Sequence, residues 1–446
     1  MRHLLERGEG SRRIAVVGAG VAGLSAAWLL SRRHEVVLYE RNAWLGGHAN
    51  TVDVECPEGP VPVDTGFIVF NPGNYPNFTA MLDHLGVGTV NTDMSLGVSV
   101  DNGRLEYSSL ARGLFGQPSN IVSPRFLRML GDILKFYGEA SRLAEHEVDG
   151  ISLGEFLERG RYSEALIDEH VLPMCAAIWS TSSAQIRDYP MRSFLRFFSS
   201  HGLLQVFNRK QWRTVRGGSR SYVDALRGEM AGRVRFRRAA AHITRTGGLV
   251  TVHGADGALD TFTDVVIASH ADEALGLLAD PSPTERNVLG AFRYTDNLAV
   301  LHDDRSLMPQ RRATWGSWNY IGARGDDGAT PLCVSYWMNR LQSLLPTRRQ
   351  LFVTLNPIRP PRHTIAAFEY THPLFDASAL SSQDRLHELQ GDRNTWFCGS
   401  YFGYGFHEDA LQSGLAVAEA LGAPAPWTKQ PSRIARAVPH ALEPAE

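Results

Sequence analysis

The strongest constraint on the fold of this chain is a stretch near its N-terminus, residues 14–47, which reads IAVVGAGVAGLSAAWLLSRRHEVVLYERNAWLGG. An apolar run over 14–17 ends in closely spaced glycines, a helix-like segment over 24–30 follows, and a second apolar run ends in an acid. This order predicts a strand, a tight turn, a helix and a second strand. The glycines are Gly18, Gly20 and Gly23, and the acid is Glu40, 22 residues after Gly18.

Each of these residues has a physical role in binding a dinucleotide. The first glycine permits the tight turn, the second lets the backbone approach a pyrophosphate, and the third lets helix and strand pack closely. The N-terminus of the helix offers free N–H groups to phosphates, and the acid stands where a ribose hydroxyl needs an acceptor. The alternative is an ordinary glycine-rich turn, but the flanking strands, helix and acid together favour a dinucleotide.

Composition restricts the function classes. The net charge of -2 argues against a nucleic-acid-binding protein. The four cysteines form no C-x-x-C pair, so we expect neither a metal site nor a disulfide framework. The N-terminal residues carry charges where a signal peptide needs an apolar core, and no run approaches the ~20 apolar residues of a membrane span. We therefore expect a cytoplasmic protein, with peripheral contact at the inner face of the membrane left open.

A second glycine-rich segment lies near the C-terminus and reads TWFCGSYFGYGFHEDALQSGLAVAEAL. A strand would end at Gly399, Gly405 would make a turn, and a helix would open at 407–410. Helix N-terminal N–H groups stabilise negative charge, such as the charge that develops on a flavin ring during reduction. We expect the backbone of Phe406 and His407 to contact a cofactor.

Several strings support a resemblance to a known family. The pattern E-R-x-x-x-x-G-G-H, which contains Gly46 and Gly47, resembles the FAD-binding N-terminus of the amine oxidase and phytoene desaturase superfamily. Residues 13–422 resemble one branch of it, the N-terminal flavoprotein domain of plant cyclopropane fatty acid synthases and bacterial furan-fatty-acid desaturases. The strings that carry this resemblance are GFIVFNPGNYPNF at 66–78, VLPMCAAIWST at 171–181, QWRTVRGGSRSYV at 211–223, LHDD at 301–304, SYWMNRLQ at 335–342, FVTLNP at 352–357 and FCGSYFGYGFHEDAL at 397–411.

The resemblance implies an α/β fold: a Rossmann-like FAD-binding domain of the glutathione-reductase and amine-oxidase type with an inserted α+β substrate domain. We assign 13–95, 206–285 and 380–422 to the discontinuous FAD domain, 96–205 and 286–379 to the substrate domain, and 424–446 to a flexible tail. The cofactor is expected to be FAD. The predicted cofactor-binding residues are Gly18, Gly20, Val21, Ala22, Gly23, Glu40, Arg41, Gly46, Gly47, His48, Gly66, Phe67, Ala240, Gly399, Gly405, Phe406 and His407.

The chemistry is less sharply defined by the sequence. The candidates for catalysis are His302, His407 and Tyr404, although a structural role is favoured for both histidines. The aromatic residues at 315–337 fit an acyl chain, an amine cage or plain packing equally well, and the apolar helices over 105–205 fit a core better than a cavity wall. Many amine oxidases place a lysine near the flavin, whereas residues 211–428 contain none.

We expect an FAD-dependent oxidoreductase that abstracts hydride from a lipid acyl chain and so acts as a desaturase or dehydrogenase of unsaturated or methyl-branched fatty acyl groups. The alternatives are a redox-neutral double-bond isomerase, a flavin amine oxidase, and a flavin-bearing partner of a cyclopropane-type methyltransferase. The expected partners are a lipid or fatty acyl substrate and such a methyltransferase.

Overall fold

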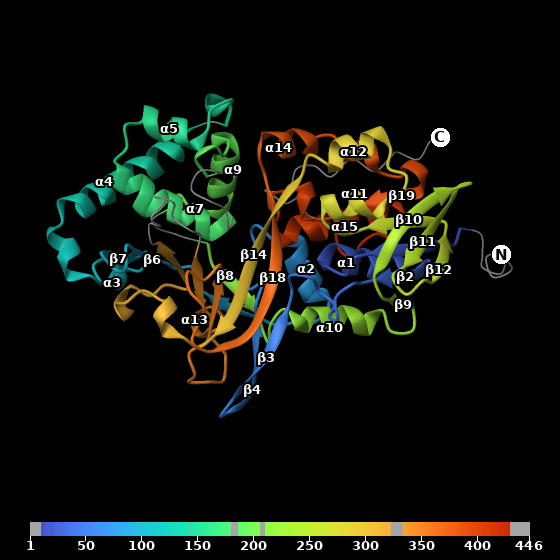
Figure 1. Cartoon of the computed structure of the whole chain (residues 1–446), viewed down its shortest axis with the longest axis horizontal. Coiled ribbons are helices and arrows are strands. Elements are labelled where there is room, and N and C mark those ends of the chain that lie inside the picture. The colour runs from blue at the N-terminus through green and yellow to red at the C-terminus, as the bar shows by residue number, and fades with distance from the viewer. Residues whose placement is uncertain (1–9, 144, 180–185, 206–209, 323–332, 429–446) are drawn as a thin grey trace.

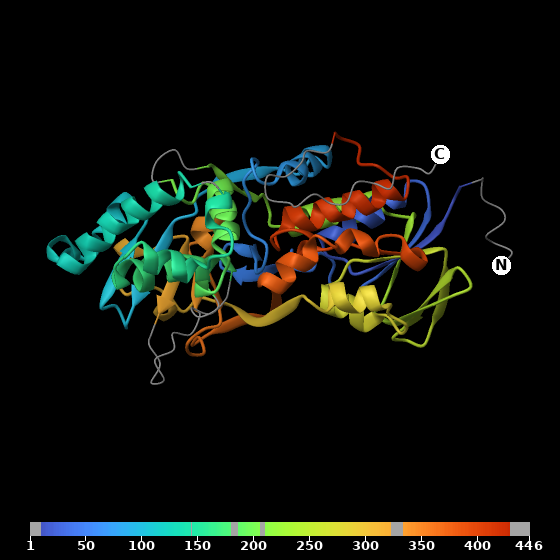
Figure 2. The same ribbon diagram turned by 90° about the horizontal axis from the view of Figure 1, so that it is seen from above.

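A computed structural model describes residues 10–428, except 144, 180–185, 206–209 and 323–332. The first residues of the segment predicted from 206, and all of the predicted tail beyond 428, lie outside the described residues. The molecule is elongated, with a parallel sheet near the two chain ends and a second, larger sheet with a group of helices at the other end (Figures 1 and 2).

The parallel sheet is built from segments that lie far apart in the sequence. Its five strands stand in the order β19-β13-β1-β2-β9, and every neighbouring pair is parallel. The strands are β1 (Arg13–Val17), β2 (Glu35–Tyr39), β9 (Val234–Arg237), β13 (Asp264–Ile267) and β19 (Thr395–Phe397). They come from all three segments assigned to the FAD domain. The apolar runs are buried on both faces of this sheet, as parallel strands require.

Two helices pack closely beside this sheet. Every residue of α1 (Val21–Leu30) is buried, and α15 (His407–Ala420) lies against it. A Cβ at Gly414 would stand 2.3 Å from the carbonyl oxygen of Ala22, so the glycine is what permits this approach. The contact holds the N-termini of α1 and α15 beside one another, although α15 begins almost 400 residues later.

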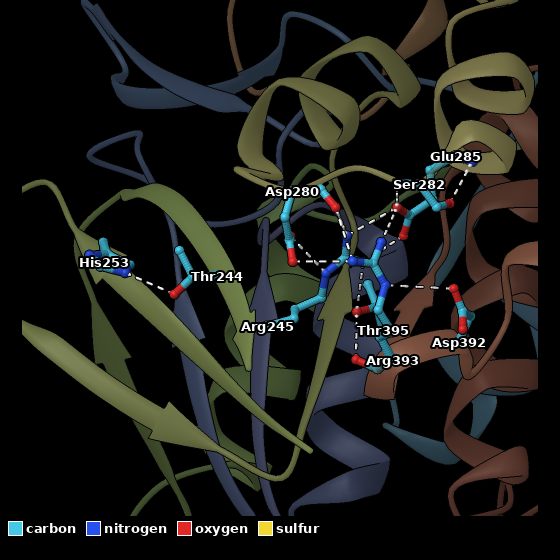
Figure 3. A network of polar contacts seen from close by, with 9 residues as sticks. All are labelled: Thr244, Arg245, His253, Asp280, Ser282, Glu285, Asp392, Arg393 and Thr395. Atoms are coloured by element: carbon cyan, nitrogen blue, oxygen red, sulfur yellow. Dashed lines mark hydrogen bonds and ion pairs between the residues drawn. The ribbon is translucent and has the colours of Figure 1, made fainter. Parts of the chain in front are cut away.

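A buried ion network connects further parts of the same region (Figure 3). Arg245 lies on β10 (Ala240–Thr246), in a three-stranded sheet completed by β11 (Leu249–Gly254) and β12 (Leu259–Phe262). Its guanidinium pairs with Glu285 at 2.5 Å and with Asp280 at 3.1 Å, and Arg393 also reaches Glu285, at 3.0 Å. The side chains of Arg245 and Glu285 are each 2% exposed. These contacts attach β10 to α12 (Pro283–Leu289) and to the loop before β19.

The larger sheet has seven strands in the order β18-β14-β17-β16-β15-β6-β7. It joins residues 96–108 to residues 293–374 through a parallel pairing of β6 with β15, and its other pairings are antiparallel. The long β14–β18 ribbon at one edge of this sheet runs along the middle of the molecule (Figure 1). The strands are β6 (Leu96–Val100), β7 (Leu105–Ser108), β14 (Arg293–His302), β15 (Trp318–Gly322), β16 (Val334–Trp337), β17 (Phe352–Leu355) and β18 (Thr364–Leu374).

Helices between β7 and β8 pack near this sheet. Ser152 caps α5, because its Oγ accepts a hydrogen bond from the Glu155 N–H at 3.2 Å. Most apolar residues of the group are core, including Phe126, Met129 and Phe136. The helices are α3 (Ala111–Leu114), α4 (Pro124–Ala140), α5 (Leu153–Arg159), α6 (Glu164–Leu166), α7 (Leu172–Trp179) and α9 (Met191–His201).

The remaining elements connect or cover these parts. The strands are β3 (Thr51–Cys56) paired with β4 (Gly59–Asp64), and β5 (Thr89–Thr92) paired with β8 (Trp212–Val215). The helices are α2 (Pro76–His84), α10 (Arg220–Glu229), α11 (Ala271–Leu277), α13 (Met338–Leu341) and α14 (Ala377–Gln383). None of the helices in the described part of the chain is both long enough and apolar enough to cross a membrane.

Candidate active site

A cavity of about 750 Å³ lies where the two sheets meet. One end is lined by the residues that follow the carboxyl ends of β1, β2, β13 and β19. The other end is lined by residues of the seven-stranded sheet and of α7 and α9. Ligands of open parallel sheets bind at the carboxyl ends of the strands, so the first end is where a nucleotide is expected.

Glycines shape the nucleotide end. Gly18 has a φ of +101°, and a Cβ there would stand 2.7 Å from the Ala268 carbonyl oxygen. Gly20 lines the cavity and has no atom within 4 Å of where a Cβ would stand, so the backbone leaves room for a ligand. Gly47 packs over it, with its hypothetical Cβ 3.2 Å from the Gly20 Cα. Gly23 does not line the cavity, and a Cβ there would stand 1.9 Å from the Gly18 carbonyl oxygen, so it serves helix packing instead.

The acid at the end of β2 completes this end of the cavity. Glu40 lines it, and its carboxylate accepts hydrogen bonds from the Ala19 N–H at 2.7 Å and the Asn42 N–H at 2.8 Å. Arg41 forms an ion pair with Glu273 at 2.7 Å across the opening. Since the N-terminus of α1 has no side-chain cap, its N–H groups remain available to a phosphate. These residues fit the diphosphate and ribose of a dinucleotide.

The second glycine-rich turn also lines the cavity. Asp409 holds its shape by accepting hydrogen bonds from the N–H groups of Tyr404 at 3.0 Å and Phe406 at 2.9 Å. Burial raises the pKa of Asp409 to about 7. His407 stacks on Phe67 with ring centroids 3.8 Å apart, and a hydrogen bond of 2.7 Å joins its Nε2 to the Tyr222 hydroxyl. Burial lowers the pKa of His407 to about 3, so the ring is neutral.

Histidines gather where the two ends of the cavity meet. His48 stacks on Tyr370 with centroids 4.9 Å apart and lies 5.6 Å from His372 and 6.1 Å from His270. Burial lowers the pKa of His48 well below its usual value and that of His372 to about 4. The Nε2 atom of His48 is buried and has no hydrogen-bond partner among the described residues. Such an orphaned atom is expected to meet a polar group of a cofactor or substrate.

The far end of the cavity is apolar, and we call it the apolar arm. Its walls are Met94, Ala177, Ile178, Trp179, Phe197, Leu203, Trp212, Trp318, Tyr336 and Leu355, together with His201, whose ring lies 4.0 Å from that of Phe197. Phe197 stacks on Phe406 at 5.0 Å and thus connects the arm to the C-terminal glycine turn. The acids that line the cavity are Glu40, Glu273 and Glu369, and the first two belong to the nucleotide end. In the described part of the chain, no group of acids, histidines or cysteines is arranged to hold a metal ion.

The structure separates the sequence-predicted residues into two groups. Those that line the cavity are Gly18, Gly20, Val21, Ala22, Glu40, Arg41, Gly46, Gly47, His48, Gly66, Phe67, Ala240, Gly399, Tyr404, Gly405, Phe406 and His407. Gly23 and His302 are not among the lining residues.

His302 lies in the larger sheet, where its Nε2 hydrogen-bonds to the Thr354 hydroxyl at 2.7 Å and its Nδ1 accepts the Asp304 N–H at 3.1 Å. Both ring nitrogens are therefore engaged, and this placement argues against the predicted catalytic role.

Other lining residues were missed by the sequence analysis. Tyr370 and His372 lie on β18, a strand that the sequence did not reveal. Trp179 and Phe197 are on helices interpreted mainly as core, whereas both contribute to the arm. Trp318 and Tyr336 line the arm, but Trp315 and Trp337 form a separate cluster with Phe352.

Comparison with known proteins agrees with this architecture. The fatty acid isomerase of P. acnes that produces CLA has a TM-score of 0.65 at 16% identity, with 90% of this chain and 97% of that one covered. A triple mutant of putrescine oxidase gives 0.64 at 13% identity, covering 93% and 99%. A putative protoporphyrinogen oxidase from Exiguobacterium gives 0.65 at 16% identity, covering 93% and 99%. These likenesses establish the fold.

Sequence comparison identifies the family. The putative flavin-containing monoamine oxidase AofH of Mycobacterium tuberculosis is 27% identical over 290 residues, and the match covers 61% of this chain and 60% of that protein. The carotenoid phi-ring synthase of Streptomyces griseus is 31% identical over 172 residues, covering 34% and 32%. The chain thus spans about three fifths or less of the length of these curated relatives. The family model for flavin-containing amine oxidoreductases matches residues 21–301. The chain belongs to the flavin-containing amine oxidoreductase family, and its cofactor is FAD.

Proposed function

We propose that this protein is an FAD-dependent oxidoreductase that removes hydride from an activated, for example allylic, carbon of a lipid acyl chain and leaves a new double bond. The observation that carries the proposal is the apolar arm, which is continuous with the nucleotide end of one cavity. An acyl chain gains free energy on entering such a space because apolar surface leaves water. A charged amine would have to lose its hydration among these apolar walls, and two of the three lining acids, Glu40 and Glu273, belong to the nucleotide end.

The chain's own residues bind and orient the cofactor. Bound FAD supplies the hydride acceptor for the reaction. Glu40 offers its carboxylate to the ribose, the N-terminus of α1 faces the phosphates, and the turn held by Asp409 presents backbone groups to the cavity. The aromatic walls of the arm exclude water from the carbon that loses hydride.

Formation of a double bond also requires an acceptor for a proton. His48 is neutral at physiological pH, since burial lowers its pKa, and its Nε2 has no hydrogen-bond partner among the described residues. In contrast, the Nε2 of His407 is bonded to Tyr222, and His302 lies away from the cavity lining. His201 also lines the cavity, and its Nε2 likewise has no hydrogen-bond partner among the described residues. We therefore assign proton acceptance to His48 or His201, in place of the two histidines suggested by the sequence.

An amine oxidase is the second candidate. The aromatic pair Trp318 and Tyr336, with centroids 5.1 Å apart and planes at 89°, offers ring faces to a cation. AofH, by its name, acts on amines. The absence of lysine from 211–428 and the distribution of acids in the lining favour the lipid.

Anaerobic titration distinguishes these functions. The FAD-loaded protein is mixed with unsaturated or methyl-branched phospholipids, the corresponding free acids, or primary amines, and flavin absorbance and product mass are recorded. Bleaching by a lipid that loses two hydrogens supports the proposal. Bleaching by amines alone identifies an amine oxidase, and a migrating double bond with oxidised flavin identifies an isomerase. Activity that requires an added cyclopropane-type methyltransferase would identify a partner subunit.

A further inference from the structure

Exposed apolar side chains are concentrated in one short part of the chain. The described part of the protein has ten exposed large apolar residues, and five of them lie between 115 and 134. These are Phe115, Ile121, Val122, Leu127 and Leu134, which are 40%, 57%, 77%, 45% and 60% exposed. We call them, with the exposed residues between them, the α4 patch. The other five are distributed over distant strands and loops, as is ordinary for a protein surface.

The sequence of α4 explains the patch. Phe126, Met129, Phe136 and Tyr137 bury one side of the helix in the core. Leu127 and Leu134, seven residues apart, therefore share the opposite side, and Ile121 and Val122 precede the helix in a short 3-10 turn. The exposed part of the helix thus carries two leucines among polar residues, although its inner side already contributes to the core.

Basic residues accompany the exposed apolar ones. Leu127 is followed by Arg128, Leu134 by Lys135, and Pro124 by Arg125, and Arg112 is exposed on the neighbouring α3. Over residues 111–139, Glu139 is an exposed acid that pairs with Lys135 at 3.9 Å, and Asp132 is half-buried and accepts a hydrogen bond from the Ser163 N–H at 3.1 Å. Arg125 also pairs with the buried Glu169, at 3.1 Å. The surface therefore combines apolar side chains with positive charge.

The α4 patch stands at one tip of the molecule. Helices α3 and α4 lie at the end opposite the parallel sheet in both views (Figures 1 and 2). At this tip, a flat surface could approach the α4 patch without meeting the FAD-binding part of the protein. Both the position and the chemistry are those of helices that lie in a membrane interface, with apolar residues among the acyl chains and basic residues at lipid phosphates.

We propose that the α4 patch docks the protein on the surface of an anionic phospholipid bilayer. Ile121, Val122 and Leu127 enter the boundary between head groups and acyl chains, while Arg112 and Arg128 contact phosphates. This binding concerns a surface outside the cavity and requires no particular substrate. Its test is therefore independent of the proposed oxidation.

Vesicle sedimentation tests the proposal with the FAD-loaded, full-length chain. Vesicles of phosphatidylcholine alone are compared with vesicles that also contain phosphatidylglycerol, at low and high salt. We expect wild type to sediment with the anionic vesicles and to be released by salt. Arg112→Gln and Arg128→Gln should each weaken partitioning roughly fivefold, the contribution of one basic side chain near such a surface.

Substitution of the apolar residues tests the proposal more sharply. The double variant Ile121→Asp/Val122→Asp should lose sedimentation, whereas Leu259→Asp, at a 68% exposed leucine on β12, should sediment like wild type. Unchanged flavin absorbance shows that each variant is folded. Wild type that stays in the supernatant with both kinds of vesicle overturns the proposal and leaves the α4 patch to a protein partner. Sedimentation of the double variant at the wild-type level also overturns it.

Discussion

Replacement of Glu40 measures how strongly FAD binding depends on one carboxylate at the nucleotide end of the cavity. Its two oxygens accept the N–H groups of Ala19 and Asn42 and face the cavity, so the carboxylate is held in place before a ribose arrives. A hydrogen bond to a charged acceptor contributes about 1.5–3 kcal/mol. Its loss in Glu40→Ala should raise the Kd for FAD by roughly 10- to 150-fold. Glu40→Gln keeps a neutral acceptor and should raise the Kd by roughly tenfold.

The assay is FAD binding to the apoprotein, followed by quenching of flavin fluorescence. Glu229→Ala is the matched control, because Glu229 is exposed at the end of α10 and does not line the cavity. Thermal unfolding of each apoprotein separates weaker binding from a damaged fold. If Glu40→Ala binds FAD as tightly as Glu229→Ala does, Glu40 is not a cofactor ligand and the dinucleotide site has been assigned to the wrong residues.

Further predictions concern the structure around the site. Arg245→Met leaves the buried Glu285 with Arg393 as its remaining basic partner and should lower the unfolding free energy by about 3 kcal/mol. The control is Arg385→Met, which removes an exposed ion pair and should leave the melting temperature unchanged. Thermal unfolding compares the two variants. Gly414→Leu forces α1 from α15 and should abolish FAD retention on gel filtration, whereas Gly228→Ala, with open space at its Cβ, should retain it. Burial lowers the pKa of His302 to about 4. As the pH falls, the imidazole of His302 therefore takes up a proton in the unfolded chain before it does so in the folded protein. In urea titrations, the unfolding free energy of wild type relative to that of His302→Gln should therefore be highest above pH ~6.5 and fall by about 3 kcal/mol toward pH 4. A difference between the two proteins that does not vary with pH would contradict the burial argument.

The nucleotide end could be predicted from sequence because its determinants are local. Glycines in a tight turn, a helix start and an acid at a strand end have fixed spacing, and each reports a backbone requirement that few other residues meet. The same reasoning located the turn at 399–407, and the resemblance to a flavoprotein family connected the two segments.

The apolar arm could not be predicted in the same way. Phe197 and Trp179 have the spacing of core residues, and a helix that faces a cavity has the same apolar periodicity as one that faces a core. The grouping of His48 with His372 depends on β18 passing beside His48, which is a tertiary contact between residues more than 300 positions apart. The hydrogen bonds that engage both ring nitrogens of His302 could not be predicted, because a buried histidine between two hydrogen-bond partners is indistinguishable in sequence from a catalytic one.

The most direct test of the account is whether an acyl chain must occupy the apolar arm for the flavin to be reduced. Ala177 lines this arm on α7 and is 3% exposed, so Ala177→Phe places a ring in the path of the chain. The measurement is the anaerobic rate of flavin bleaching by a lipid substrate, with reduction by dithionite as the control for bound, accessible FAD. We predict that lipid bleaches the variant roughly a hundredfold more slowly than wild type, while dithionite reduces both alike. Equal bleaching of the two proteins by lipid, or bleaching of wild type by amines and not by lipids, would contradict it.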